Sequence, residues 1–240
     1  MTDPRAAIIQ ERMKEIKRII AVSSGKGGVG KSLVSSTLAL ALAKRGYKVG
    51  LFDLDFTSPS THLILGISGV QPKEDKGIVP PEVHGLKYMS ITYYSGDLAA
   101  PLRGADVSNA LLELLSVTLW GRLDFLVLDM PPGIGDVTLD LIRLLPTAEF
   151  LIVTTSSELA FETVKKLAGL LVELKVPFLG VVENMKMDKS REIRLKTEKL
   201  GLRFLTGIPY DPRIESALGS GNNLLRTKLG REIGLLASEI

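Results

Sequence analysis

The sequence predicts an α/β protein: a doubly wound, mostly parallel sheet with helices on both of its faces. Short apolar runs rich in β-branched residues alternate with helix-like segments along the whole chain, as in parallel strands joined by crossover helices. Several of these runs are almost continuously apolar, which is typical of strands buried on both faces. Two of them end in aspartate, and carboxylates at the carboxyl ends of parallel strands lie where ligands bind.

The expected strands are short and apolar, and the expected helices show an amphipathic or small-residue pattern. Strands are expected over residues 18–23, 48–53, 86–91, 123–129, 150–155, 178–184 and 202–205. Helices are expected over residues 2–17, 32–45, 106–118, 158–174 and 190–200, followed by two C-terminal helical stretches. Residues 66–85 are rich in glycine, proline and charge, so we expect a surface excursion there.

The N-terminal helix is expected to pack against the body of the domain. Its apolar residues Ile9, Met13 and Ile16 lie on one helical face. A chain of 240 residues, of which 45% are hydrophobic, is long enough to form one full-sized core. We therefore expect a single domain over residues 1–240, with a closing helix over residues 224–240.

The composition excludes several classes of site. The chain has no cysteine, so it forms no disulfide, thiolate-held metal site or cysteine nucleophile. Its two histidines leave little for a histidine metal site, and a net charge of +3 is too small to indicate nucleic acid binding. No apolar run reaches the length of a membrane span and the charged N-terminus is unlike a signal peptide, so we expect a cytoplasmic protein.

The stretch 24–32 matches the phosphate-loop pattern G-x-x-x-x-G-K-[ST]. Backbone N–H groups converge on one anion only where the chain reaches φ values that glycine adopts at little cost. Lys31 adds a positive charge over the outer phosphates, and the Ser32 hydroxyl can bind Mg²⁺. A strand precedes the loop and a helix follows it, so phosphates would lie at a helix N-terminus. The residues expected to contact the nucleotide here are Gly25, Lys26, Gly27, Gly28, Val29, Gly30, Lys31 and Ser32.

Three aspartates follow the expected strands and can serve a bound nucleotide. Asp129 ends an apolar strand, where a carboxylate that holds Mg²⁺ through water is expected. Asp53 and Asp55 can share one face of an extended segment, because side chains alternate along it. One of these two can order the metal's water while the other orients the attacking water, and their chemistry alone does not rank them.

Lys26 is the unusual residue of the loop. The pattern requires no lysine there, and a second cation beside Lys31 is repulsive unless an anion is present. Its ammonium could stabilise charge on a transferring phosphoryl group, either in its own subunit or across a dimer.

The loop Gly25–Ser32 resembles the deviant Walker A motif of the MinD/ParA/Mrp ATPases, and the chain most resembles their Mrp (ApbC) subfamily of iron–sulfur cluster carriers. Four other segments carry this resemblance. They are Leu102-Arg103-Gly104, the run from Trp120 to Asp136 with its ending Pro-Pro-Gly-Ile-Gly-Asp, Leu179-Gly180-Val181-Val182-Glu183-Asn184-Met185, and Ile208-Pro209-Tyr210-Asp211. The resemblance implies a P-loop NTPase fold and slow hydrolysis of ATP with Mg²⁺.

At the phosphate end, the resemblance implies that Lys26 reaches the nucleotide of the partner subunit in a homodimer that holds ATP between its subunits. Lys31 would bind the β- and γ-phosphates. Ser32 would bind Mg²⁺ and Asp129 would be the Walker B acid. Asp55 would position the attacking water, which leaves Asp53 on the side of the metal.

At the base end, the resemblance implies that Asn184 reads the edge of the adenine, with Pro209 and Asp211 lining the base. The loop over residues 131–136 would sense the γ-phosphate.

The chain departs from the Mrp pattern after its Glu-Asn-Met segment. Mrp carriers have a Cys-x-x-Cys pair there, where two subunits hold a bridging cluster, whereas residues 186–190 of this chain are Lys-Met-Asp-Lys-Ser. Thioether sulfur is a poor substitute for thiolate on iron, so we expect Met185 and Met187 to be packing residues. We therefore expect no iron–sulfur cluster, and an assembly or scaffold role toward a protein client that the sequence does not identify.

Two other classes of function compete with this interpretation. A MinD- or ParA-type positioning ATPase would use a membrane or DNA surface, and the amphipathic segment Leu224–Ile240 is its best feature. Arg226, Lys228 and Arg231 are offset there by two glutamates, which favours a docked closing helix over a lipid anchor. The other class is a nucleotide-binding regulatory module that does not hydrolyse ATP.

Overall fold

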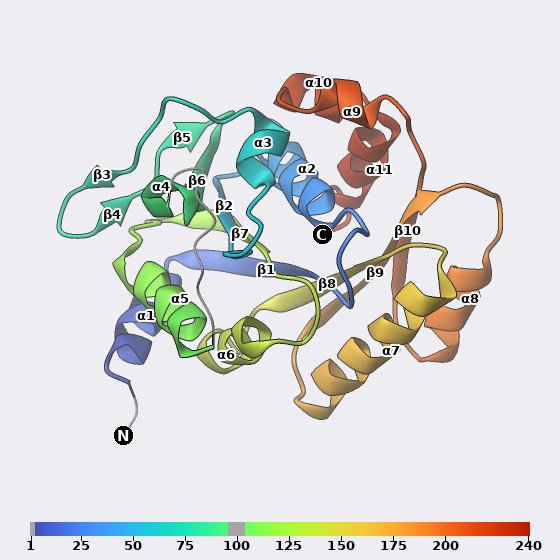
Figure 1. Cartoon of the computed structure of the whole chain (residues 1–240), viewed down its shortest axis with the longest axis horizontal. Helices are drawn as coiled ribbons and strands as arrows, with labels where there is room; N and C mark the ends of the chain where they lie inside the picture. The colour runs from blue at the N-terminus through green and yellow to red at the C-terminus, as the bar shows by residue number, and fades with distance from the viewer. Residues whose placement is uncertain (1–2, 96–103) are drawn as a thin grey trace.

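The computed structural model describes residues 3–95 and 104–240, and an eight-stranded sheet lies at its centre (Figure 1). The strands are β1 (Ile16–Ser24), β2 (Val49–Asp53), β3 (Lys73–Glu74), β4 (Ile78–Val79), β5 (Glu82–Val83), β6 (Leu86–Ser90), β7 (Leu123–Asp129), β8 (Glu149–Thr154), β9 (Phe178–Lys186) and β10 (Phe204–Pro209). Eight of these strands form the central sheet, in the order β10-β9-β8-β1-β7-β2-β6-β5. Neighbours are parallel, except that β5 runs antiparallel to β6. β3 and β4 pair separately.

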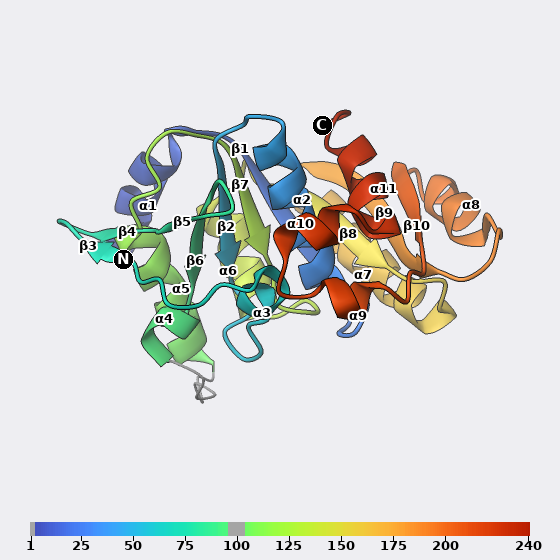
Figure 2. The ribbon, with the colours of Figure 1, turned by 90° about the horizontal axis from the view of Figure 1, so that it is seen from above.

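Helices cover both faces of this sheet, as Figures 1 and 2 show. They are α1 (Arg5–Met13), α2 (Lys31–Lys44), α3 (Thr61–Leu65), α4 (Thr92–Ser95), α5 (Ala105–Val117), α6 (Asp136–Leu144), α7 (Glu158–Glu173), α8 (Glu192–Lys199), α9 (Ile214–Ala217), α10 (Gly221–Leu225) and α11 (Lys228–Leu236). α2, α3, α10 and α11 lie on one face, and α1, α5, α6 and α7 on the other. The predicted doubly wound, mostly parallel α/β architecture is confirmed.

Each face of the sheet has its own apolar core. On one face the rings of Phe52 and Trp120 lie 5.6 Å apart, among residues of α1, α5 and α6. On the other face α2 buries Leu38 and Leu42 against the sheet. The central strands β1 and β7 are buried almost throughout, which explains their unbroken apolar sequences.

The N-terminal helix is shorter than predicted. α1 ends at Met13, whereas the apolar pattern predicted a helix over residues 2–17. Ile9 and Met13 are buried as expected, but Ile16 belongs to β1 and pairs with the first residue of β7. Strand pairing takes over at this point because it satisfies the backbone hydrogen bonds of Ile16 within the sheet.

The helix α6 was not predicted, because the run Pro-Pro-Gly-Ile-Gly before it indicates only a loop. Its pattern is nevertheless helical. Val137, Leu141 and Leu144 recur at i, i+4 and i+7 and are buried, and Asp136 lies in the first turn, where an acid is favourable.

The C-terminal region differs from the predicted helix over residues 224–240. α10 ends at Leu225, and Thr227 then caps α11 by accepting the Gly230 N–H at 3.0 Å. The apolar face of α11 packs against α2 and β10, as predicted for a docked closing helix. Across residues 3–95 and 104–240, no helix combines the length and the apolar character that a bilayer crossing requires.

Candidate nucleotide site

The phosphate loop lies between the carboxyl end of β1 and the N-terminus of α2. Gly28 and Gly30 have φ values of 79° and 81°, which L side chains rarely adopt. The loop borders a hollow of about 240 Å³, whose other walls include Asp55, Ser60 and Pro132. Free N–H groups and the positive end of a helix dipole face such a position, so it favours an anion.

Two glycines of the loop are required by close packing. A Cβ on Gly25 would lie 2.2 Å from Thr163 Oγ1 of α7, and a Cβ on Gly30 would lie 2.3 Å from Asn184 Nδ2 of β9. The contact at Gly25 includes the Thr163 backbone carbon at 2.7 Å, which cannot move aside as a side chain can, so α7 restricts the loop there; at Gly30 the positive φ adds to the contact with Asn184.

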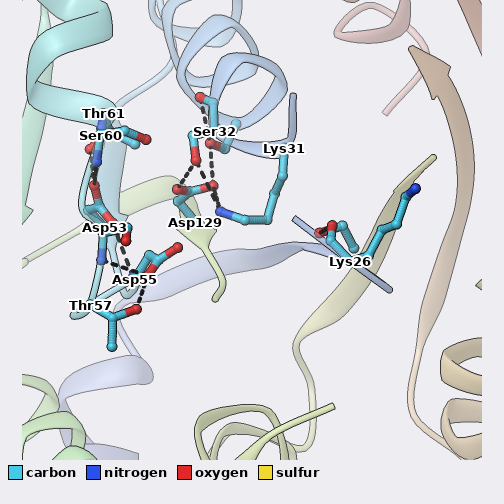
Figure 3. Close-up of polar contacts among 12 residues, drawn as sticks. Lys26, Lys31, Ser32, Asp53, Asp55, Thr57, Ser60, Thr61 and Asp129 are labelled. Carbon is cyan, nitrogen blue, oxygen red and sulfur yellow. Dashed lines mark hydrogen bonds and ion pairs between the residues drawn. The ribbon is translucent and has the colours of Figure 1, made fainter. Parts of the chain in front are cut away.

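Lys31, Ser32 and Asp129 form one hydrogen-bonded cluster beside the hollow (Figure 3). Lys31 Nζ donates to Asp129 Oδ1 at 2.7 Å, and Ser32 Oγ donates to Asp129 Oδ2 at 2.7 Å. Ser35 Oγ also donates to Asp129 Oδ1, at 2.8 Å. The Asp129 carboxylate is fully buried, and the buried ammonium of Lys31 is its ion-pair partner.

The oxygen atoms of this cluster are suitable ligands for Mg²⁺. Within the described ranges, no group of three or more His, Cys, Asp or Glu side chains could hold a metal alone. Mg²⁺ does not need such a cage, because it keeps several waters and binds one or two carboxylates together with phosphates. The Ser32 hydroxyl and the Asp129 carboxylate lie 2.7 Å apart and meet that requirement. They lie beside the hollow bordered by residues 26–33, Asp55, Ser60 and Pro132, which we call the phosphate hollow.

Asp53 is buried at the end of β2 and accepts hydrogen bonds from the loop that follows it. Its Oδ1 accepts from the Asp55 N–H, and its Oδ2 accepts from the N–H groups of Ser60 and Thr61 and from Thr61 Oγ1. Burial, followed by the charge of Asp129, raises the pKa of Asp53 to about 7. This geometry favours a role in holding the loop over the metal-side role predicted for Asp53.

Asp55 borders the phosphate hollow, and its role toward an attacking water stays a prediction. Its Oδ1 accepts from Thr57 Oγ1 at 2.9 Å and from the Ser58 N–H at 3.1 Å. Its carboxylate therefore keeps an oxygen for which the described residues provide no hydrogen bond.

Lys26 is half-buried at the rim of the same hollow. Figure 3 shows its side chain directed away from Lys31 and from the three aspartates. Among the described residues no acid lies within ion-pair distance of its ammonium. Its role toward a partner subunit stays a prediction.

A second hollow lies beside the first and shares Leu33 with it. The fold brings Asn184, Pro209 and Asp211 together in this hollow, which we call the base-end hollow, and their roles toward a base stay predictions. Asn184 Nδ2 donates to the Val29 carbonyl at 3.0 Å. The amide oxygen of Asn184 takes no part in this hydrogen bond.

Asp211 also bonds to two neighbours of its own chain. It accepts from the Arg213 guanidinium and from the Lys228 N–H, and these partners hold its pKa well below the usual range. The Asp211 carboxylate thus joins the segment after β10 to the start of α11.

The loop over residues 131–136 lies against the phosphate loop. The Gly133 N–H donates to the Ser24 carbonyl at 2.8 Å, and Pro132 borders the phosphate hollow. Whether the loop senses a γ-phosphate stays a prediction. Of the first segment of the resemblance, Leu102 and Arg103 lie outside the described residues, and Gly104 precedes α5 with a φ of 49°.

The segment over residues 186–190 is held in a loop by the ammonium of Lys186. Lys186 Nζ donates to Glu183 Oε2 at 3.1 Å and to the Ser190 carbonyl. Met185 borders the base-end hollow, but the expectation that Met187 packs is wrong, since it is 84% exposed.

Several site residues were not predicted: Ser35, Ser60, Thr61 and Tyr210. Ser35 lies one helical turn after Ser32, so the helical period could have placed it beside the same acid. Ser60 and Thr61 reach Asp53 only through the path of the loop, for which the sequence carries no periodic signal.

Comparison with protein families and relatives agrees with this geometry. A family model described as ParA, NUBPL iron-transfer P-loop NTPase, matches residues 15–237. The chain is 38% identical over 232 residues to the iron-sulfur cluster carrier protein of Aquifex aeolicus, which covers 90% of this chain and 64% of that protein. It is also 38% identical over 238 residues to the iron-sulfur cluster carrier protein of Methanococcus maripaludis, which covers 92% of this chain and 82% of that protein. The chain thus spans less than two thirds of the length of the Aquifex relative.

Solved structures show the same fold. A nucleotide-binding protein from Archaeoglobus fulgidus in complex with ADP superposes with a TM-score of 0.78 at 32% identity, covering 91% of this chain and 92% of that one. The septum site-determining protein MinD of Pyrococcus horikoshii, complexed with Mg-ADP, gives a TM-score of 0.71 at 24% identity, covering 92% and 95%. The second likeness concerns the fold alone.

Proposed function

This chain belongs to the ParA family of NUBPL iron-transfer P-loop NTPases, and from that premise we propose that it binds ATP with Mg²⁺ and hydrolyses it slowly as a nucleotide-switched homodimer. The observation that carries the proposal is the cluster of Lys31, Ser32 and Asp129 at the N-terminus of α2. A phosphate hollow and a base-end hollow adjoin it, in the order that a nucleoside triphosphate needs.

The phosphates would be bound by the backbone N–H groups of the loop and by the ammonium of Lys31. Ser32 would bind Mg²⁺ directly and Asp129 would hold it through water. When bound, the metal supplies charge neutralisation for the outer phosphates. The hydroxyl and the carboxylate already lie 2.7 Å apart, so these donors need little rearrangement.

Hydrolysis also needs an oriented water and a cation beside the transferring phosphoryl group. Asp55 borders the hollow and can accept a proton or a hydrogen bond from the attacking water. The Lys26 side chain points away from the cluster of Lys31, Ser32 and Asp129, which suits a contact with the nucleotide of a second subunit. This contact is what would make turnover depend on the dimer.

We propose that the ATP-driven switch serves assembly or scaffolding in metal-centre maturation. The support is the family itself and the carriers to which the chain is similar. The chain has no cysteine with which to hold an iron–sulfur cluster as those carriers' name implies, so the proposed role is to act on a client protein.

The proposal is tested by measuring ATP binding calorimetrically and phosphate release with and without Mg²⁺. Lys31→Ala removes the cation over the outer phosphates and leaves the buried Asp129 unpaired, so we expect ATP affinity to fall at least ~10-fold and phosphate release to be lost.

Lys199→Ala is the matched control, because Lys199 is exposed at the end of α8. The control should bind and hydrolyse ATP as the unmodified protein does. Binding of ATP without any Mg²⁺-dependent phosphate release would instead identify a non-hydrolysing regulatory module.

A further inference from the structure

One wall of the phosphate hollow is the loop between β2 and α3, and a single carboxylate holds both ends of that loop. Asp55 near its start and Ser60 near its end border the hollow. The Asp53 side chain accepts the Asp55 N–H at 3.1 Å, and it accepts the N–H groups of Ser60 and Thr61 at 3.2 and 3.1 Å (Figure 3). The position of Asp55 at the hollow therefore depends on where the Asp53 carboxylate points.

The shortest of these contacts comes from a side chain. Thr61 Oγ1 donates to Asp53 Oδ2 at 2.6 Å, and Thr61 is fully buried. A hydroxyl has one proton, so this bond uses the only one that Thr61 has. A short bond from a buried hydroxyl to a carboxylate is stronger than one between neutral groups.

The same hydroxyl is held from its other side by Tyr88 of β6. Tyr88 OH lies 2.9 Å from Thr61 Oγ1, and the tyrosine is fully buried. Burial raises the pKa of Tyr88 far above its ordinary value, so the phenol keeps its proton. When Asp53 is ionised, the Thr61 proton is donated to its carboxylate, so the Tyr88 hydroxyl donates to Thr61 and the bonds run in one direction from β6 to Asp53.

We propose that Thr61 is a positioning residue for ATP hydrolysis: its hydroxyl, itself held by Tyr88, orients Asp53 and so fixes the loop that presents Asp55 at the phosphate hollow. The inference rests on the hydrolysis proposed above and adds to it the residues that set the geometry of the water-orienting group. Thr61 does not border the hollow, so it acts through Asp53 and not on the nucleotide.

The test separates positioning from nucleotide binding by measuring kcat and KM for ATP in four variants. Thr61→Val keeps the shape and removes the hydroxyl, and we expect kcat to fall by ~10- to 100-fold, since misplacement by about 1 Å can cost that much. KM and the calorimetric ATP affinity should stay within about threefold, because the phosphate loop is untouched. Thr61→Ser should restore kcat to within about threefold of the unmodified protein.

Tyr88→Phe keeps the bond between Thr61 and Asp53 but loses its support, so its kcat should lie between those of the unmodified protein and Thr61→Val. Thr197→Val is the matched control: Thr197 is equally buried, but its hydroxyl donates to the Ile193 carbonyl within α8. It should change neither kcat nor KM.

Amide hydrogen exchange gives a readout that does not depend on turnover. In Thr61→Val, and to a smaller extent in Tyr88→Phe, the N–H groups of Asp55 and Ser60 should exchange faster than in the unmodified protein, while those of β1 and β7 keep their rates. If the unmodified protein releases no phosphate, the proposed function fails, and the exchange rates still decide the positioning role.

Three outcomes would overturn the inference. The first is an unchanged kcat together with unchanged exchange in both Thr61→Val and Tyr88→Phe. The second is a raised KM with kcat preserved, which would make Thr61 a nucleotide-binding residue. The third is a Thr61→Ser variant as slow as Thr61→Val, which would show that the methyl group and not the hydroxyl matters.

Discussion

Asp53 gives the protein a pH dependence of stability opposite in sign to that of an ordinary paired carboxylate. Burial and the charge of Asp129 raise its pKa in the folded chain from 3.8 to about 7. Between these two values the folded chain holds a proton that the unfolded chain has released, so the free energy of unfolding falls as pH rises through this window. One such group contributes a slope of at most about 1.4 kcal/mol per pH unit.

Asp53→Asn removes this titration, and we expect its free energy of unfolding to fall less than that of the unmodified protein as pH rises through the window. Urea unfolding at several pH values measures the free energy of unfolding of the variant and of the unmodified protein. Asp124→Asn is the control, since its hydrogen bond from Lys17 lowers the pKa of Asp124, so this carboxyl does not hold a proton in the folded chain across the window. Equal slopes for Asp53→Asn and the unmodified protein would contradict the assignment.

The same residues show how far sequence reasoning reaches at the scale of a side chain. The positions of the phosphate-loop residues could be predicted because a strand, a glycine loop and a helix follow one another, and the position of Asp129 because it ends an apolar strand. The roles of Asp53 and Asp55 could not be separated. Their difference arises from Ser60 and Thr61, which return to Asp53 only after the loop has turned.

At the scale of elements, α7 is a support for the phosphate loop. Gly25 of the loop packs on Thr163, and an added Cβ would lie 2.2 Å from the threonine Oγ1 and 2.7 Å from its backbone carbon. Backbone cannot move aside as a flexible side chain can, so we expect Gly25→Ala to lower the free energy of unfolding by about 1–3 kcal/mol, as overpacking usually does.

Gly27→Ala is the matched control for that change, because nothing lies within 4 Å of its added Cβ and its φ is not positive. Urea unfolding without nucleotide measures both variants, and Gly27→Ala should stay within about 0.5 kcal/mol of the unmodified protein. If the two variants are equally stable, the contact between α7 and the loop does not constrain the fold.

Element prediction succeeded where one pattern dominated and failed where two competed. β7 was predicted with its observed bounds because it is a continuous apolar run ended by an acid. α6 was missed because its start follows directly on a proline- and glycine-rich run. α1 was predicted too long because Ile16 fits the helical face and the strand equally well, and only pairing with β7 decides between them.

At the scale of the whole molecule, the sheet order places the nucleotide site between two halves of the chain. β1 has β7, β2, β6 and β5 on one side and β8, β9 and β10 on the other, so the direction of winding changes at the end of β1. Ligands bind at such switch points. The phosphate hollow is built from the first half with Pro132 of the loop after β7, and the base-end hollow from β9, β10 and the residues after them. A bound nucleotide would therefore bridge both halves.

Lys26 extends this argument to two molecules. Its ammonium points away from Lys31, and two cations in one loop are repulsive unless each has its own anion. In the proposed homodimer the anion for Lys26 is the nucleotide of the second subunit. Lys26→Ala should then abolish phosphate release and also weaken ATP-dependent dimer formation, whereas ATP binding to the monomer should persist through Lys31.

Sedimentation velocity with and without ATP, combined with a phosphate-release assay, measures both effects. Asp55→Ala is the informative companion, because it removes the water-orienting carboxylate and leaves Lys26 in place, so it should accumulate as an ATP-bound dimer that does not turn over. Opposite effects of the two variants on dimer population, with loss of turnover in both, are expected only if Lys26 acts across the interface and Asp55 within its own site. A Lys26→Ala protein that hydrolyses ATP at the unmodified rate would rule out the shared site.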